Sequence, residues 1–257
     1  MTALAVRDLS KGFGGVQALE GVTFTVERGE RRGVIGPNGA GKTTLFHAIS
    51  GTLLPSSGTI FLFDSEITRL APYARARLGL ARTFQITNLF PGLSVLENVL
   101  LAVQRTRGGG LGLLRPMTAR RHLIERAERL LDEWGLSGSA RRLVKHLSYG
   151  EQRQIELILA LAGSPRVLLL DEPTAGLSSA ETARVVAMIR GLPREITILM
   201  IEHDMDVAFQ LADRIREQGY TLEIDPEALT ILAEEGFDPE YGARPVRRVI
   251  QERIESE

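Results

Sequence analysis

Residues 36–43 read Gly-Pro-Asn-Gly-Ala-Gly-Lys-Thr and match the pattern G-x-x-x-x-G-K-[ST]. The glycines allow the backbone to curl so that successive N–H groups point at a polyphosphate, and the helix that follows adds its positive N-terminus. Lys42 would reach the β- and γ-phosphates, and the Thr43 hydroxyl would bind Mg²⁺. The alternative is an ordinary glycine-rich turn, but the strand and the helix that must flank the motif are both predicted here.

Two adjacent carboxylates follow the apolar run at residues 167–170. A carboxylate at the end of a strand beside a phosphate loop can hold Mg²⁺, and Asp171 is placed for this role. The neighbouring Glu172 would polarise the attacking water as a general base. A solvated acidic loop is the alternative. Two adjacent acids followed by Pro173, in a chain that has a phosphate loop, favour the functional interpretation.

Three further polar positions belong to less specific patterns. His203 follows the apolar run at residues 196–201 and would contact a γ-phosphate or orient the catalytic carboxylate, although a single histidine is more often structural. Gln85 would contact Mg²⁺ or water, or cap a helix. Ser148 would cap a helix that starts near Gly150, and such a helix start is a second anion site. Because one phosphate loop serves one nucleotide, the second site makes sense if it completes the site of another subunit.

The elements that must position these residues follow from the pattern of apolar residues. Short strands with turns are predicted over residues 3–35, and a helix over 43–50. The runs at 167–170 and 196–201 are short and continuous, as expected for strands buried on both faces of a parallel sheet. Ligands usually bind at the carboxyl ends of such strands. Residues 92–161 are mostly helical in pattern, apart from one glycine-rich connection.

Composition excludes several classes of protein and site. The 257 residues include no cysteine, which excludes disulfides and thiolate metal sites and suits a reducing cytosol. The net charge of −1 gives no overall attraction to nucleic acid, so no nucleic-acid partner is expected. No run of about 18 apolar residues is present, and the segment 1–9 reads as a strand rather than a signal peptide. Any role at a membrane must therefore go through a partner.

In the order and spacing of its motifs, the segment 1–213 resembles an ATP-binding cassette (ABC) ATPase. The matching segments are Walker A at Gly36–Thr44, the Q-loop at Gln85, the signature at Leu147–Gln152, Walker B at Val167–Glu172, a D-loop at Ala175–Leu177 and the switch histidine His203. Residues 82–85, 89–91 and 95–99, with Tyr149 in the signature, resemble more closely the LivG-like branch of branched-chain amino acid importer ATPases.

The resemblance implies a fold, cofactors and a set of site residues. The fold is α/β, a P-loop NTPase (RecA-like) core with an antiparallel β subdomain and a helical subdomain at about residues 86–165. The cofactors are ATP and Mg²⁺. The catalytic residues would be Glu172, His203, Lys42 and Gln85, and the metal ligands Thr43, Gln85 and Asp171. The nucleotide would contact Phe13, Gly36, Asn38, Gly39, Ala40, Gly41, Lys42, Thr43, Thr44, Ser148, Gly150 and Glu151.

The same resemblance implies partners and a location. Two ABC ATPase subunits, identical or different, would close head to tail over two ATP molecules. Closure would drive two transmembrane permease subunits, which dock on the helical region around residues 86–146, and a periplasmic solute-binding protein would deliver the solute. The chain is expected to be peripheral, at the cytoplasmic face of the inner membrane, with no signal peptide or transmembrane segment.

The C-terminal segment differs in composition from the rest of the chain. From Arg214 onward there are 6 basic and 11 acidic residues, against 25 and 21 in residues 1–213. The segment 216–257 resembles the end of the C-terminal small domain of a Clp-type AAA+ unfoldase, and its pattern predicts strand, helix, loop and helix. We therefore expect an ABC domain over 1–213 and a small α/β appendage, a Clp-type fragment, over 214–257. The ABC core is expected to lack the strands and helix that usually close it.

Four functions remain open from the sequence. An importer subunit for branched-chain or other hydrophobic amino acids accounts for most of the motifs. A soluble ABC ATPase outside transport is an alternative, but such chains usually carry two cassettes, coiled-coil insertions or basic surfaces. A chimeric nucleotide-binding module with little turnover is another, because the C-terminal segment is foreign to the family. A Clp-like unfoldase matches only that segment.

Overall fold

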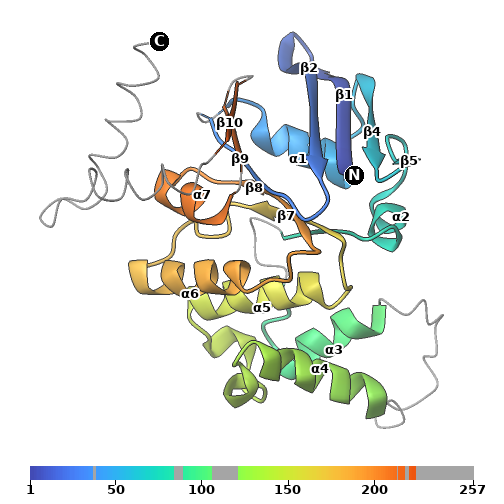
Figure 1. The fold of residues 1–257 in the computed structure, drawn as a ribbon. Helices are drawn as coiled ribbons and strands as arrows, with labels where there is room; N and C mark the ends of the chain where they lie inside the picture. The colour runs from blue at the N-terminus through green and yellow to red at the C-terminus, as the bar shows by residue number, and fades with distance from the viewer. Residues whose placement is uncertain (37–38, 84–88, 106–120, 213, 218–219, 224–257) are drawn as a thin grey trace, which may run out of the picture.

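The computed structural model describes residues 1–36, 39–83, 89–105, 121–212, 214–217 and 220–223, and its elements are drawn in Figure 1. The strands are β1 (Thr2–Phe13), β2 (Val16–Glu27), β3 (Arg31–Val34), β4 (Ser57–Leu62), β5 (Ser65–Glu66), β6 (Leu80–Arg82), β7 (Val167–Asp171), β8 (Thr197–Ile201), β9 (Arg214–Glu217) and β10 (Tyr220–Glu223). The helices are α1 (Lys42–Ser50), α2 (Pro72–Arg77), α3 (Val95–Arg105), α4 (Arg121–Glu133), α5 (Tyr149–Leu161), α6 (Ser179–Arg190) and α7 (Met205–Leu211), with two 3-10 turns at Ser137–Ser139 and Val144–His146.

A six-stranded sheet with the order β10-β9-β3-β8-β7-β6 forms the centre of the fold. Its strands are parallel to their neighbours except β10, which pairs antiparallel with β9. Every residue of β7 and β8 is buried, because both faces of the sheet are covered. Leu169 and Leu199 point into the core around α1, while Leu168 and Met200 pack on α5, α6 and α7. The predicted buried parallel strands are therefore confirmed.

A second sheet, with the order β2-β1-β4-β5, is antiparallel. Its apolar face shares one core with α1 and with the central sheet, so α1 is enclosed between the two sheets. Phe46 and Ile49 on α1 are fully buried in this core. The sequence predicted short strands at the N-terminus, whereas β1 and β2 are each 12 residues long and pair along most of their length.

The helices α3, α4 and α5 form a separate apolar core at the end of the molecule opposite the antiparallel sheet (Figure 1). Val99 on α3, Leu131 on α4 and Ile158 on α5 are among its fully buried members. The helix α5 also faces the central sheet through Leu157 and Leu161, so it joins the two parts of the molecule. The predicted helical region is confirmed in the described residues, and most of the glycine-rich connection before α4 lies outside them.

The central sheet continues past residue 213. The strand β9 pairs parallel with β3, at Arg32–Arg214, Gly33–Ile215 and Val34–Arg216, and β10 pairs with β9. Two strands therefore extend the central sheet beyond residue 213, whereas the core was expected to lack its usual last strands. The helices predicted after residue 224 lie outside the described residues.

Candidate functional site

The phosphate loop connects β3 to α1, as the motif predicted. Gly36, Gly39 and Gly41 have φ angles of 150°, 85° and 81°, which are conformations that favour glycine. A Cβ atom at Gly41 would collide with the carbonyl oxygen of Ala18 on β2, so the loop packs tightly on the antiparallel sheet. The start of α1 has no side-chain cap and no acidic residue in its first turn. A helix start of this kind is a suitable site for an anionic ligand.

Lys42, the first residue of α1, faces back over this loop. Its Nζ donates a hydrogen bond of 2.5 Å to the carbonyl oxygen of Gly36, and the side chain is buried. Burial lowers the pKa of Lys42, and the nearby charge of Glu172 opposes that effect. A pocket of about 180 Å³ lies here, lined by Ala18, Gly39, Ala40, Gly41, Lys42, Thr43, Thr44, Glu172 and His203.

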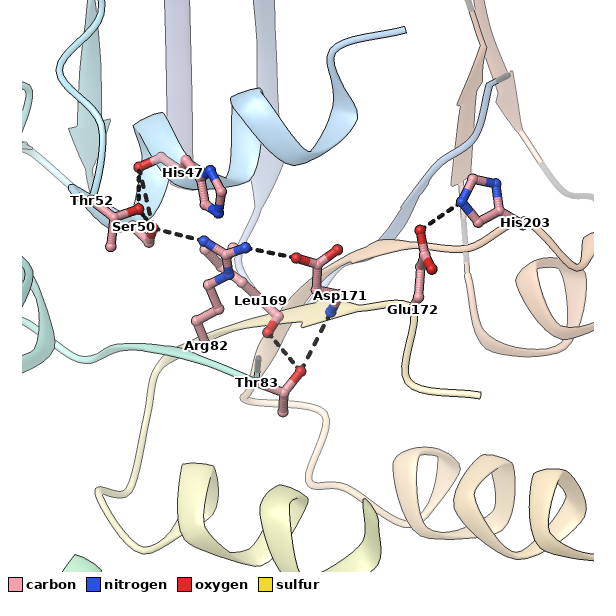
Figure 2. A network of polar contacts seen from close by, with 9 residues as sticks. All are labelled: His47, Ser50, Thr52, Arg82, Thr83, Leu169, Asp171, Glu172 and His203. Carbon is pink, nitrogen blue, oxygen red and sulfur yellow. Dashed lines mark hydrogen bonds and ion pairs between the residues drawn. The ribbon is translucent and has the colours of Figure 1, made fainter. Parts of the chain in front are cut away.

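Glu172 and His203 come from neighbouring strand ends and meet at this pocket. The Oε1 atom of Glu172 lies 2.6 Å from Nε2 of His203 (Figure 2). Glu172 has a φ angle of 46°, a left-handed conformation that is uncommon for a residue with a side chain, and its N–H donates to the carbonyl oxygen of Ile201. The structure therefore brings together the base and the histidine that the sequence proposed.

Asp171, the last residue of β7, is held by a residue that the sequence analysis missed. Arg82 at the end of β6 donates from Nη2 to Oδ2 of Asp171 at 2.6 Å and from Nη1 to Oγ of Ser50 at 3.1 Å (Figure 2). The backbone N–H of Asp171 lies 3.4 Å from Oγ1 of Thr83. The other carboxylate oxygen, Oδ1, is buried and has no hydrogen-bond partner among the described residues. The adjacency of β6 and β7 creates this pair, and a single sequence contains no direct signal for it.

A buried carboxylate also connects the two strand ends behind the pocket. Oε1 of Glu202 accepts hydrogen bonds from the N–H and the hydroxyl of Thr174, at 3.3 and 2.9 Å. Burial raises the pKa of Glu202 despite these hydrogen bonds. Because Glu202 precedes His203 and Thr174 follows Glu172 by two positions, this contact fixes the two segments relative to each other.

The signature segment forms the capped start of α5, as predicted. Ser148 accepts from the N–H of Glu151, and the Glu151 carboxylate accepts from the N–H of Ser148, which completes a capping box. Burial would raise the pKa of Glu151, but hydrogen bonds from Arg142 and Ser148 lower it below its usual range. The Glu151 side chain is therefore engaged within its own helix start and with Arg142, 2.5 Å away.

Several predicted residues stand apart from the pocket. Ser148, Gly150 and Glu151 are not among the residues that line it. Phe13 lies at the end of β1, is 49% exposed, and does not line the pocket either. Asn38 and Gln85 lie outside the described residues. Within the part of the chain that the structure describes, the pocket gathers residues of the phosphate loop together with Glu172 and His203.

Comparisons with known proteins match two segments of the chain. The family described as ABC transporter matches residues 19–175, and the C-terminal, D2-small domain of ClpB protein matches residues 205–257. The high-affinity branched-chain amino acid transport ATP-binding protein LivG of Escherichia coli (strain K12) is 39% identical over 219 residues, which cover 82% of this chain and 86% of LivG. BraF of Pseudomonas aeruginosa, with the same description, has the same identity and coverage.

Solved structures resemble the chain over most of its length. A nucleotide-free ATP-binding cassette from an ABC transporter has a TM-score of 0.77 at 27% identity, covering 93% of this chain and 97% of that chain. A bacterial ABC transporter cassette in a dimeric structure has a TM-score of 0.69 at 26% identity, covering 82% of this chain and 92% of that one. Among the described helices, none has both the length and the apolar character required to cross a membrane.

Proposed function

Since this chain belongs to the ABC transporter family of ATP-binding proteins, we propose that it is the subunit that hydrolyses ATP for an importer of branched-chain or other hydrophobic amino acids. The 39% identity to LivG and BraF supports this class of solute. The single observation that carries the catalytic part is the pocket in which Lys42, Glu172 and His203 meet at the edge of the central sheet.

The proposed chemistry is in-line attack of water on the γ-phosphate of ATP. Lys42 and the N–H groups at the start of α1 neutralise the charge of the phosphates. Glu172 takes the proton of the attacking water, and His203, 2.6 Å from its carboxylate, orients that base. A general base of this kind contributes about 10²–10⁴-fold to a rate.

The residues present fit a magnesium ion. Oδ1 of Asp171 is a buried oxygen that has no hydrogen-bond partner in the described part of the chain, and Thr43 lines the same pocket as Lys42. No group of three or more acidic or histidine side chains that could hold a metal occurs among the described residues. Mg²⁺ usually binds through one or two protein ligands together with substrate phosphates, and Asp171 and Thr43 would supply such ligands. Asp171 and Thr43, with Gln85 as a further proposed ligand, would hold the ion, which would neutralise charge on the β- and γ-phosphates.

We further propose that the working form is a dimer of this chain with itself or with a related subunit. Ser148 and Gly150 present a hydroxyl and an N–H at the start of α5, away from the residues that line the pocket. These donors would bind the γ-phosphate held by the partner subunit's phosphate loop. Phe13 would stack on the adenine, and Asn38 would contribute to the phosphate loop.

A surface for the transmembrane partners is proposed on the helical region. Phe90, before α3, is 57% exposed, and Leu101 on α3 is 38% exposed. Exposed large apolar side chains of this kind are found at protein–protein contact sites. Two permease subunits would dock here from the membrane, at the cytoplasmic face, and a separate solute-binding protein in the periplasm would supply the solute.

The proposed domain division is an ABC domain over 1–213, with a helical subdomain at about 86–165, and a Clp-type fragment over 214–257. The family matches at residues 19–175 and 205–257 support two segments of different descent. The central sheet crosses this division, because β9 pairs with β3. In this division, β9 and β10 belong to the Clp-type fragment and replace the strands that usually close the sheet of an ABC domain.

Comparing the purified chain with Glu172→Gln tests the proposed activity. We expect the wild type to hydrolyse ATP slowly and the variant to lose about 10²–10⁴-fold in rate while still binding ATP and forming a dimer with it. Glu125→Gln is the matched control, because Glu125 is an α4 carboxylate paired with Arg121 on the surface. Equal rates for wild type and Glu172→Gln would exclude Glu172 as the base.

A further inference from the structure

Both donors at the start of the signature helix already bind an anion that belongs to this chain. Oγ of Ser148 and the backbone N–H of Gly150 each donate to Oε1 of Glu181, both at 3.1 Å. Glu181 lies in the first turn of α6. Its other oxygen, Oε2, accepts from the N–H and hydroxyl of Ser178, at 3.1 and 2.8 Å. One carboxylate therefore caps α6 with one oxygen and fills the anion site of α5 with the other.

The contact between the starts of α5 and α6 leaves no space for a side chain at position 150. A Cβ atom built at Gly150 would lie 2.5 Å from Oε1 of Glu181 and 2.6 Å from its Cδ atom, so only glycine allows the carboxylate to reach this N–H. The hydrogen bonds from Ser178, Ser148 and Gly150 lower the pKa of Glu181 to about 2. The side chain therefore carries a full negative charge at neutral pH.

From this geometry we propose that the Glu181 carboxylate is an internal occupant of the signature's phosphate site and must leave before a partner's γ-phosphate binds Ser148 and Gly150. The inference rests on the proposed dimer, in which those two donors bind nucleotide held by the other subunit. Two anions cannot share the same two donors, because like charges at contact distance repel. The need to displace Glu181 then opposes closure of the dimer. Glu181 therefore sets the protein concentration at which the ATP-bound chains dimerise.

The glutamine substitution at this position removes the charge and keeps the helix cap. Glutamine serves as well as glutamate at this position of a capping box, so the Glu181→Gln amide oxygen can still accept from Ser178. The NH₂ group of the glutamine then faces the N–H of Gly150 and cannot accept a hydrogen bond from it. Glu97 offers a matched control, because it closes the same kind of capping box at the start of α3, where its hydrogen bonds go to Ser94.

The test measures ATP-dependent dimerisation in the Glu172→Gln background, by light scattering over a series of protein concentrations with saturating ATP and Mg²⁺. We expect Glu181→Gln to lower the protein concentration at which half of the chains are dimeric, by about tenfold or more. The reason is that the hydrogen bonds from Ser148 and Gly150 to a charged carboxylate, which compete with the phosphate, are lost. Glu97→Gln should leave it unchanged. Glu181→Ala should shift it in the same direction as Glu181→Gln, even if its thermal stability is lower.

The outcomes separate this inference from the proposed function. If the Glu172→Gln background forms no dimer with ATP at any concentration, the proposed dimer fails and the inference fails with it. If that background dimerises but Glu181→Gln dimerises equally well or less well, the proposed function stands and the role of Glu181 is overturned. A shift of the same size in Glu97→Gln would also overturn it, because the effect would then be one of helix capping.

Discussion

Arg82 and Asp171 form a buried ion pair at the edge of the central sheet, with Nη2 of Arg82 2.6 Å from Oδ2 of Asp171. The Arg82 side chain is 7% exposed and that of Asp171 is 1% exposed. The pair occupies one oxygen of the carboxylate, and the other, Oδ1, has no hydrogen-bond partner within the residues that the structure describes. Arg82 thus fixes one oxygen of Asp171, the residue that we propose as a magnesium ligand, although Arg82 does not itself line the pocket.

Replacing Arg82 with methionine should destabilise the fold. Breaking a buried ion pair by removing one partner typically costs about 3–5 kcal/mol, because the remaining charge is left uncompensated. The loss is measured by urea unfolding at neutral pH. Arg121→Met is the control, since Arg121 forms an exposed pair with Glu125 one helical turn away, worth about 0.5 kcal/mol or less. A loss below about 1 kcal/mol for Arg82→Met would contradict the prediction.

Removal of magnesium should abolish hydrolysis. A metal ion at a phosphoryl group contributes several kcal/mol of transition-state stabilisation, so chelation with EDTA should lower the rate by at least about 100-fold. Asp171→Asn should raise the Mg²⁺ concentration needed for the half-maximal rate. Phosphate release measured over a magnesium titration checks both. Unchanged turnover in EDTA would exclude the proposed role of Asp171 and Thr43.

Substitution of His203 should affect turnover more than nucleotide binding. Without the imidazole, the Glu172 carboxylate loses the partner 2.6 Å away that orients it, and we expect the hydrolysis rate to fall by about 10²-fold or more in His203→Ala. Titration with a fluorescent ATP analogue should show binding close to that of the wild type. His122→Ala, on the surface of α4, is the control. Wild-type turnover in His203→Ala would show that the contact is structural.

The stability of the protein should fall with rising pH through the titration of Glu202. Burial raises the pKa of Glu202 in the folded state, so the folded chain binds this proton more tightly than the unfolded chain. The contribution of Glu202 to the free energy of unfolding is fully present below the ordinary glutamate pKa. It is lost as the pH rises from there through the raised pKa of the folded state, by no more than about 1.4 kcal/mol per pH unit.

Glu202→Gln tests this linkage, because the amide removes the titration and retains an oxygen for Thr174. Urea unfolding at several pH values above 4.5 should give a flatter dependence for Glu202→Gln than for the wild type. Glu195→Gln, at an exposed position before β8, should follow the wild-type curve. The same slope in wild type and Glu202→Gln would show that Glu202 does not titrate in this range.

Local sequence patterns were sufficient to predict most of the elements. The apolar runs of β7 and β8, the helix that ends at Gly51 and the serine-capped start of α5 all depend on residues close together in the chain, and each prediction is confirmed. The resemblance to ABC ATPases and to the Clp small domain is confirmed by the family matches. The sequence analysis did not place β9 in the central sheet, because three of the four residues of Arg214–Glu217 are charged. Its position next to β3 depends on a sheet edge that is distant in sequence.

By itself, the sequence determined the chemistry available at the carboxyl edge of the sheet. Glycines at fixed spacing before Lys42 specify a curled loop, and acids directly after an apolar run specify carboxylates at a strand end, since both depend on covalent neighbours. The tertiary structure alone decided that Arg82 holds Asp171 and that Glu181 binds Ser148 and Gly150. Those contacts join segments 31 to 89 residues apart, and only strand order and helix packing bring such segments within hydrogen-bonding distance.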